Sequence, residues 1–249
     1  MEVVTPSPSI KELPDNVFDN CKVLYRVRPD IDIAMHIEKI GDSAFFDCKN
    51  ISDVFVENIT SQAKEIGYGA FSGCDSLTKV TLGDNVEKIG SRAFAKCGSL
   101  ETVEFPSSVK EYGYEMFEDC TALKNAFLPD GATIIRNGFY RGNSAMTDTY
   151  IPDSVETIED YAYKGCSSLG RVTIPDSVTK ISDHAFEGCP GVIICGSLNS
   201  EAHNYAIRNN ISFATVLSKI AKNSSMLLFP VIQGLSELEH LAKIQTLLN

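Results

Sequence analysis

Apolar and polar residues recur along this chain with a fixed period. Six times, an apolar residue stands eight positions before a Cys, or before the Asn that once replaces it, and a Phe or Tyr stands three positions before it. Each block begins 23 residues after the last. The blocks are Ile66–Cys74, Ile89–Cys97, Tyr112–Cys120, Ile135–Asn143, Ile158–Cys166 and Ile181–Cys189. A repeat of this length is typical of a solenoid, in which each unit buries its apolar side against its neighbours.

The repeat extends towards the N-terminus. Ile40–Cys48 is another copy, 26 residues before the next, so three residues are inserted around 58–63. Leu13–Cys21 is a worn first copy. We therefore predict a solenoid domain over residues 1–195 with about eight units, the first of them at about 13–39.

Each unit combines a short strand with a turn. Leu77, Val80 and Leu82 end in the alternation of a strand with one buried face. A Pro follows at equivalent places in four later units, just past the strand end, where its missing N–H is tolerated. An Ala-Phe pair comes next, as in Ala70-Phe71, and fits a tight turn or short helix. The pattern predicts one strand per unit, stacked into a parallel sheet.

Seven of the eight Cys occupy one position of the repeat. Zinc needs ligands that converge on a point, and a column of single Cys forms a line instead. Equivalent side chains on parallel strands point the same way, which disfavours disulfides. We therefore predict buried free thiols that act as small hydrophobes, and we expect no metal site. Asn143 shares with Cys a compact side chain that can donate a hydrogen bond to a turn carbonyl.

The full unit, Leu-x-x-Val-x-Leu-Pro-x-x-Val-x-x-Ile-Gly-x-x-Ala-Phe-x-x-Cys, resembles the BspA-like leucine-rich repeat, also called the Treponema pallidum type. Residues 99–109 and 168–178 are close copies. The resemblance implies an α/β-type repeat solenoid: a right-handed coil with a parallel sheet on its concave face and short turns, 3₁₀ or helical segments on its convex face. It also implies a surface or secreted protein that binds other macromolecules, adhesin-like in some members, and it carries over no catalytic residues.

Two segments follow the repeats. Residues 196–214 look like the C-terminal cap of this family, a short helix followed by an apolar strand-like pair, with Ala202, Tyr205 and Ala206 on one helical face. Residues 215–249 match nothing in the family. Within them, 236–248 begin with a capping-box pattern and have an amphipathic spacing. This helix is interpreted as a second cap, as a partner-binding or self-associating element, or as part of a disordered tail.

The outward positions of the predicted strands form the candidate partner-binding surface, because side chains alternate between the two faces of a strand. Asp53 and Phe55 are expected to belong to the same columns. The candidate binding residues are Lys79, Thr81, Thr102, Glu104, Asn125, Phe127, Asp148, Tyr150, Arg171 and Thr173. Phe127 and Tyr150 are expected on adjacent strands about 5 Å apart. Exposed aromatic residues are enriched at binding hot spots, but aromatic cross-strand pairs also stabilise sheets for their own sake.

Charge and composition limit the classes of partner and of function that this chain can have. A net charge of −11 opposes binding to nucleic acid or to an anionic membrane, and it is consistent with a basic partner or with solubility alone. The longest apolar stretch, 226–232, contains a Pro and is too short to cross a bilayer. The four His lie in unrelated contexts, and no Walker, G-x-S-x-G or G-x-G-x-x-G motif occurs. We expect no enzyme activity and no cofactor.

The sequence thus predicts a non-enzymatic binding module that recognises a protein or glycan, with a host extracellular protein among the candidates. From the family resemblance, it is expected at the cell surface or secreted, although no signal peptide is visible. The alternative is an intracellular interaction scaffold, favoured by free thiols and by the amphipathic segment. Self-association through residues 215–249 is a further possibility.

Overall fold

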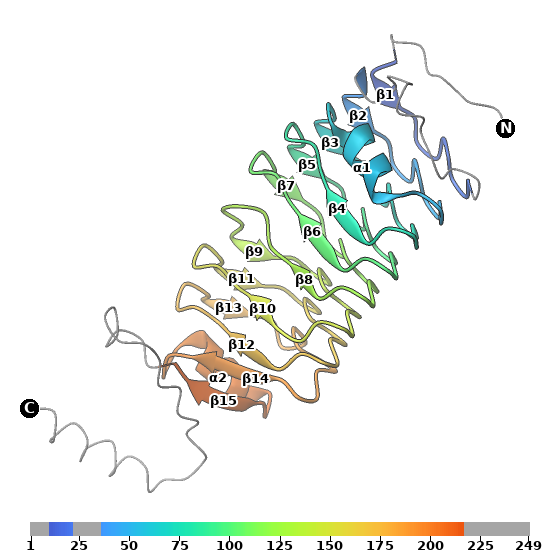
Figure 1. Ribbon diagram of the computed structural model, residues 1–249. Coiled ribbons are helices and arrows are strands. Elements are labelled where there is room, and N and C mark those ends of the chain that lie inside the picture. The colour runs from blue at the N-terminus through green and yellow to red at the C-terminus, as the bar shows by residue number, and fades with distance from the viewer. Residues whose placement is uncertain (1–9, 22–35, 217–249) are drawn as a thin grey trace, which may run out of the picture.

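The structure, a computed structural model, describes residues 10–21 and 36–216, and not the side chains of 125 and 126. The described chain winds into about eight stacked coils that form one elongated body (Figure 1). Strands of successive coils pair in parallel, as predicted for a repeat solenoid. The predicted helix at 236–248 lies outside the described residues.

Most coils contain two short strands, where the sequence had predicted one. The first strand ladder precedes the turn of each coil and contains β1 Glu12–Leu13, β2 Lys39–Ile40, β3 Glu65–Ile66, β5 Lys88–Ile89, β7 Glu111–Tyr112, β9 Ile134–Ile135, β11 Thr157–Ile158 and β13 Lys180–Ile181. Two residues are too few for an alternation to show in the sequence, which is why the prediction of a single strand was wrong.

The second strand ladder follows the turn and corresponds to the predicted strands. Its members are β4 Lys79–Thr81, β6 Thr102–Glu104, β8 Asn125–Ala126, β10 Thr149–Tyr150, β12 Arg171–Thr173, β14 Ile193–Gly196 and β15 Ser212–Thr215. Val80, Val103 and Val172 are buried at the inward position of their strands, as the alternation predicts. The labelled strands of this ladder lie on the side that faces the viewer in Figure 1.

The turns form a third ladder, and its core is a column of stacked rings. The ring column consists of Phe18, Phe45, Phe71, Phe94, Phe117, Tyr140, Tyr163 and Phe186. Neighbouring ring centroids are 4.9 to 6.2 Å apart. The backbone N–H of each ring residue up to Tyr163 donates to a carbonyl of the next coil, for example Phe45 to Ala70 at 2.8 Å and Phe117 to Phe139 at 3.1 Å. This turn ladder therefore runs through the whole stack without a gap.

Both strand ladders are interrupted at one place. Strands β1, β2, β3, β5 and β7 form one sheet while β9, β11 and β13 form another, and β8 and β10 likewise belong to different sheets. In the described chain, neither Thr133 nor Ile134 donates a backbone hydrogen bond to the preceding coil. Instead, the Tyr112 hydroxyl donates to the carbonyl of Ile134.

The interruption coincides with the end of a glycine column. Four early coils place Gly directly after the first strand, and a Cβ on Gly90 would lie only 2.5 Å from the backbone carbon of Gly67 in the coil before. The next coil has Arg136 in this position. Its side chain needs room that the glycine coils lack, and its guanidinium lies 5.5 Å from the Tyr112 ring centroid. Glu159 and Ser182 hold this position in the next two coils, where β9, β11 and β13 pair normally, so the interruption is confined to the step at which Gly gives way to Arg136.

Residues 53–60 depart from the predicted strand pattern. Helix α1, Asp53–Thr60, begins after the N-cap Ser52 and takes the place of a strand beside β4. The expectation that Asp53 and Phe55 point outward from a strand is wrong, because Phe55 is buried and packs edge-on against Phe45. The Asp53 carboxylate accepts hydrogen bonds from the N–H and hydroxyl of Thr78. The three inserted residues thus make room for a helix that covers the edge of β4.

Helix α2, Glu201–Arg208, covers the last coil, and β15 after it pairs with β14. Ala202, Tyr205 and Ala206 are buried against the coil. The Tyr205 hydroxyl accepts from the N–H of Phe186 at 3.3 Å, so it takes the place of the carbonyl that a further coil would supply. The boundaries of the cap at 196–214 remain a prediction.

Candidate binding face on the second strand ladder

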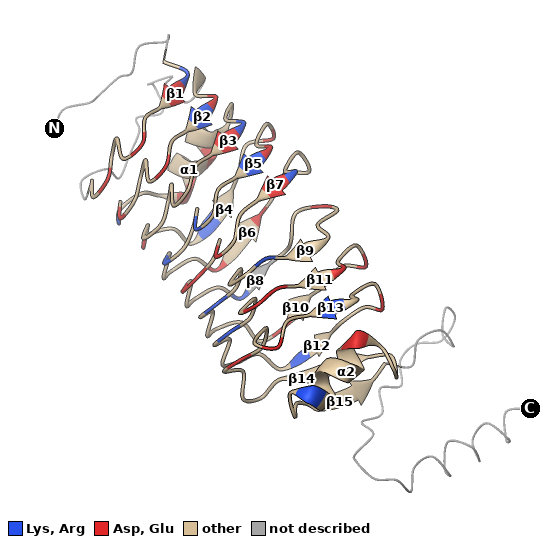
Figure 2. Cartoon of the chain, turned by 180° about the vertical axis from the view of Figure 1, so that it is seen from behind, with Lys and Arg blue, Asp and Glu red and all other residues tan. Residues whose placement is uncertain are grey.

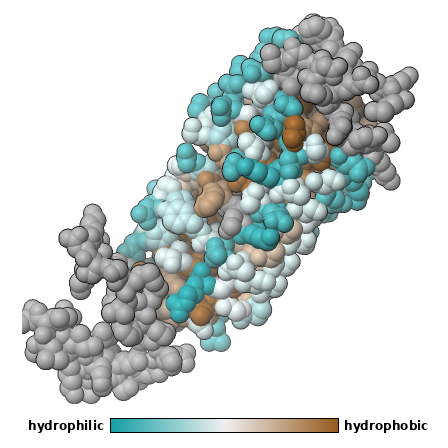
Figure 3. Space-filling view, in the orientation of Figure 1, coloured by the Kyte–Doolittle hydropathy of each residue, from teal (hydrophilic) through white to brown (hydrophobic). Residues whose placement is uncertain are grey.

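The outward side chains of the second strand ladder lie on an open face. Lys79, Glu104, Phe127, Asp148, Tyr150, Arg171 and Thr173 are exposed, while Thr81 and Thr102 are half-buried. The side chain of Asn125 is not described. Seen from this side, the surface is mainly hydrophilic, with hydrophobic residues in small separate areas (Figure 3). The exposed side chains of this face thus stand singly, at the repeat positions of successive strands.

Phe127 and Tyr150 are the aromatic members of this face. Phe127 directly follows β8 and Tyr150 ends β10, so the two residues occupy the same repeat position on consecutive coils. Phe127 is 60% exposed and Tyr150 is 66% exposed, so neither ring belongs to the core. The predicted spacing of about 5 Å assumed one continuous sheet, whereas β8 and β10 belong to different sheets. The rings therefore flank the interruption of the strand ladder.

Charges on this face differ on the two sides of the interruption. Before it, Lys79 pairs with Glu104 at 3.0 Å. After it, neither Asp148 nor Arg171 makes an ion pair with another residue in the described part of the chain. Arg171 extends towards the following coil, with its Nη1 3.9 Å from the Cys195 sulfur. The Asp148 carboxylate accepts one hydrogen bond, from the Thr147 hydroxyl at 3.3 Å, and both it and the Arg171 guanidinium are solvent-exposed beside Tyr150.

The inward position beneath Tyr150 is polar. Thr149 occupies the place that Val holds in other coils, and its hydroxyl lies 3.2 Å from the buried Tyr163 hydroxyl. Burial raises the pKa of Tyr163 above its ordinary value, so this hydroxyl stays protonated and needs a hydrogen-bonding partner. The Thr for Val replacement therefore gives this hydroxyl its partner.

The Cys column belongs to the core, as predicted. All eight cysteines are free, and six of the seven column members are buried, whereas Cys21 at the N-terminal end is half-buried. Each of those six thiols donates to the carbonyl of a ring residue in the preceding coil, for example Cys97 to Phe71 at 3.2 Å. Burial raises the pKa of Cys97 to about 12 and that of Cys189 to about 11. At neutral pH these thiols are therefore not nucleophiles.

Asn143 departs from the prediction made for it. Its side chain is fully buried, but neither Nδ2 nor Oδ1 has a hydrogen-bond partner among the residues that the structure describes. The side-chain bond expected to a turn carbonyl is not formed, although the backbone N–H of Asn143 donates to the Tyr140 carbonyl at 3.3 Å. The ring spacing does not account for this, because it is 6.2 Å both from Phe117 to Tyr140 and from Phe94 to Phe117, where the Cys120 thiol does bond. The replacement of Cys by Asn thus leaves two buried polar atoms unpaired.

Two columns of alternating charge run along the first strand ladder, and they were not predicted from the sequence. One column reads Lys11, Glu38, Lys64, Glu87, Lys110, and the adjacent column reads Glu12, Lys39, Glu65, Lys88, Glu111. Figure 2 shows this alternation of colour from β1 to β7. Ion pairs form between coils, among them Lys39–Glu12 at 2.6 Å and Lys88–Glu65 at 3.1 Å. Sign alternation at the repeat spacing was visible in the sequence and could have predicted these strands.

A buried charge network lies on the turn side near the interruption. Glu118 is 4% exposed and contacts Arg92 at 3.3 Å and Arg141 at 3.3 Å. Glu115 contacts the same two arginines, at 2.7 and 3.7 Å. Hydrogen bonding to Glu115 is the main cause that raises the pKa of Arg92. Two carboxylates and two guanidinium groups neutralise one another across three coils, so this cluster is structural.

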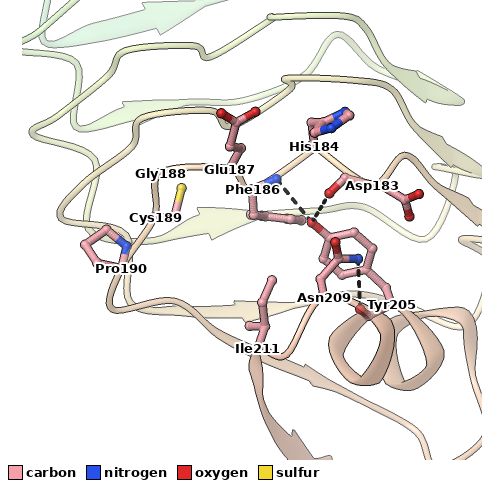
Figure 4. A pocket seen from close by; sticks show the side chains of 10 residues that line it. All are labelled: Asp183, His184, Phe186, Glu187, Gly188, Cys189, Pro190, Tyr205, Asn209 and Ile211. Carbon is pink, nitrogen blue, oxygen red and sulfur yellow. Dashed lines mark hydrogen bonds between the residues drawn. The ribbon is translucent and has the colours of Figure 1, made fainter.

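A pocket of about 360 Å³ lies between the last turn and the cap. Its walls include Phe186, Pro190 and Ile211, and Asp183 and Glu187 contribute carboxylates (Figure 4). The polar groups have structural partners. Tyr205 donates to the Asp183 carbonyl, Asp183 pairs with Arg208, and Glu187 pairs with Lys164. The pocket thus contains no obvious catalytic arrangement.

The described residues contain neither a cluster of metal ligands nor a membrane-spanning helix. Over residues 10–21 and 36–216, no group of three or more His, Cys, Asp or Glu is placed to hold a metal ion. Among the same residues, no helix has the length and apolar character needed to cross a membrane.

Comparisons with known proteins give the family. The sequence profile of the BspA type leucine rich repeat region, with six copies, matches residues 1–65, 38–145, 64–193 and 133–224. These matches span most of the chain, so the protein belongs to this family. The family and the solenoid fold are typical of non-enzymatic interaction modules. A search of the curated proteins finds no match.

One solved structure agrees with this assignment at the level of the fold, and two further similar structures are given after it. A leucine-rich repeat protein of T. pallidum is 21% identical, with a TM-score of 0.56, and the match covers 78% of this chain and 95% of that one. The pneumococcal vaccine antigen PcpA is 17% identical, with a TM-score of 0.49, 84% of this chain covered and 67% of that one. A leucine rich cell surface protein of Faecalibacterium prausnitzii is 21% identical, with a TM-score of 0.36, 88% of this chain covered and 75% of that one.

Proposed function

We propose that this protein is a non-enzymatic binding module that recognises a protein or glycan partner through the second strand ladder. One observation carries the proposal: Phe127 and Tyr150 are more than half exposed on the face where Asp148 and Arg171 have no ion-pair partner among residues 10–21 and 36–216. Elsewhere on the strand ladders, charges are largely matched between coils. Solvent-exposed apolar rings beside available charges are the features that a partner can cover.

The face has a centre and a periphery. Phe127, Tyr150, Asp148 and Arg171 form its centre, which we call the ring platform. The remaining candidates flank it along the solenoid axis, and they are Lys79, Thr81, Thr102, Glu104, Asn125 and Thr173. Truncating a central residue should weaken binding most, whereas the flanking positions should contribute less.

A defined panel of extracellular matrix and plasma proteins tests this site. The full chain is immobilised beside a double variant, Phe127→Ala with Tyr150→Ala, and both surfaces are exposed to each protein in turn. We expect the native chain to retain a partner that the double variant releases. Equal retention on both surfaces would reject the ring platform as the binding site.

We further propose that the module works at the cell surface or in secreted form, adhesin-like, with host extracellular proteins among its candidate partners. The family resemblance supports this location. Protease treatment of intact cells, followed by detection of the native full-length chain, tests it. Degradation by external protease is the expected result, and full protection would favour an intracellular protein.

An intracellular interaction scaffold is the second candidate. The eight free cysteines favour it, because thiols stay reduced in the cytosol. Thiol titration of freshly isolated protein, together with the localisation experiment, separates the two candidates. Light scattering with and without residues 215–249 tests self-association through that segment.

A further inference from the structure

The two rings of the platform are exposed in an unusual way. In the described chain, neither Phe127 nor Tyr150 takes part in the aromatic stacking that engages most other rings of the solenoid. They stand on an open sheet face and not in the 360 Å³ pocket at the cap. Hot-spot residues for protein partners usually lie in well-packed sites that a surrounding rim keeps dry. An open pair of rings fits a flat ligand that lies across them.

A sugar ring is such a ligand. The faces of an aromatic ring carry partial negative charge, and the C–H groups on the face of a pyranose ring present partial positive charge. Phe127 and Tyr150 occupy the same repeat position on consecutive coils. A linear oligosaccharide that runs along the solenoid axis can therefore place successive sugars over successive rings.

The polar groups beside Tyr150 match sugar hydroxyls. A hydroxyl both donates and accepts hydrogen bonds, whereas the Asp148 carboxylate only accepts and the Arg171 guanidinium only donates. Asp148 precedes Tyr150 by two residues, about 6–7 Å along the strand. Arg171 stands one coil further, in the repeat position of Asp148. Neighbouring hydroxyls of a sugar stacked on Tyr150 therefore lie within reach of both charged groups.

Charge selects among glycans. Asp148 and Arg171 balance each other locally, and the whole chain has a net charge of −11. A polyanionic glycan would meet this field unfavourably, and an uncharged one would not. We propose that the ring platform binds an uncharged hexose-based oligosaccharide, stacked on Phe127 and Tyr150 and hydrogen-bonded by Asp148 and Arg171. This inference rests on the binding function proposed above and specifies its ligand class.

Calorimetric titration of the full chain with three neutral hexasaccharides tests the ligand class. The probes are cellohexaose, mannohexaose and chitohexaose, and an acidic galacturonic acid hexamer serves as the charged comparison. We expect at least one neutral probe to bind and the acidic one to bind at least about tenfold more weakly. Failure of all three neutral probes, or tighter binding of the acidic one, overturns the proposal.

Variants test the geometry. Phe127→Ala and Tyr150→Ala should each weaken binding by about tenfold or more, whereas Tyr150→Phe retains the ring and stays close to the native affinity. Asp148→Asn and Arg171→Gln should weaken binding several-fold. Tyr68→Ala and Tyr114→Ala remove exposed rings, 42% and 50% accessible, that lie outside the platform, and they are the matched controls. Equal effects in the controls and in the platform variants would overturn the site.

The outcomes separate this inference from the proposed function. Suppose that the double variant Phe127→Ala with Tyr150→Ala loses a matrix or plasma protein while no neutral hexasaccharide binds the native chain. Then the platform binds a protein, and the glycan assignment is wrong. If the double variant loses neither a protein partner nor a glycan, the platform itself is rejected and both proposals fail.

Discussion

The turn ladder and the strand ladders of this solenoid are built differently. The turn ladder repeats one arrangement in every coil, with a ring in the ring column and, in six of the eight coils, a thiol bonded to the ring residue before it. The strand ladders change in composition along the axis and are interrupted between β7 and β9 and between β8 and β10. The comparison indicates that the turn ladder holds the stack together, whereas the strand side is free to vary and to carry the binding face.

The largest difference should appear at alkaline pH, because burial raises the pKa of the column thiols, to about 12 for Cys48 and about 11 for Cys189. The folded pKa lies above the unfolded value of about 8.5, so this stability is complete below pH 8.5 and is lost as the pH rises towards the folded pKa. Each such thiol costs about 1.4 kcal/mol per pH unit in that window. Urea unfolding between pH 8 and 10.5 measures the loss, which should reach about 2–3 kcal/mol for each such thiol.

Removing one column thiol provides the control for this pH dependence, because the first strand ladder contains no thiol that could contribute to it. In Cys97→Ala, the free energy of unfolding should fall less steeply with pH, by about 1.4 kcal/mol per pH unit, which is the contribution of one thiol. An unchanged slope, or stability that does not fall up to pH 10.5, would show that the thiols are accessible to water in the folded state.

Truncation of a ring in the turn ladder should have the next largest effect. Phe117 is fully buried and contacts Phe94, Phe105, Phe139 and Tyr140. We expect Phe117→Ala to lower the free energy of unfolding by about 3–5 kcal/mol, because it leaves a cavity where the backbone hydrogen bonds between the two halves of the described chain lie in the turn ladder. Phe127→Ala on the strand face should change it by less than about 0.5 kcal/mol. Comparable losses in urea unfolding would remove the distinction between the two sides.

Asn143 allows the turn ladder to be repaired. Asn143→Cys removes two buried polar atoms that have no partner and restores the residue found in other coils. We expect the free energy of unfolding to rise by about 1–3 kcal/mol. The reverse change in the preceding coil, Cys120→Asn, should lower it by a similar amount. A destabilised Asn143→Cys variant would mean that the amide has partners that the structure does not show.

Charge reversal on the first strand ladder should have the smallest effect. Lys88→Glu places three like charges in a row with Glu65 and Glu111, and we expect a loss of about 0.5–1 kcal/mol that shrinks in salt. Lys180→Glu lies in the same ladder beyond the interruption, where its neighbour is Thr157, and should be nearly neutral. Thermal unfolding at low and high salt compares the two. Equal shifts would show that the alternation does not stabilise the first half.

The sequence predicted the turn ladder well because every coil solves the same packing problem with the same residues. The thiol column, the Ala-Phe turns and the solenoid followed directly from the 23-residue period. Features that differ between coils were harder to predict. Helix α1 depends on only three inserted residues, and the interruption depends on Arg136 in a column that is otherwise Gly in the preceding coils.

The candidate binding face was predicted from the sequence only in part. Its positions followed from the two-residue period of a strand, and the structure shows Phe127 and Tyr150 exposed. The sequence could not show that the strand ladder is interrupted between them, because this depends on how closely neighbouring backbones approach. Nor did the sequence show that Lys79 has an ion-pair partner, whereas Asp148 and Arg171 have none within the described part of the chain. The role of the platform in binding stays a prediction.

Hydrogen exchange of individual backbone amides tests the central claim most directly. The N–H groups of Phe117 and Asp119 bond across the interruption, at 3.1 and 2.7 Å, so they should be as protected as those of Tyr163 and Gly165 in the turn ladder further along. The amides of Thr133 and Ile134 should exchange at least about tenfold faster than the amide of Thr157, which bonds to Thr133. Fast exchange at Phe117 and Asp119, or equal protection at Ile134 and Thr157, would contradict an unbroken turn ladder beside interrupted strands.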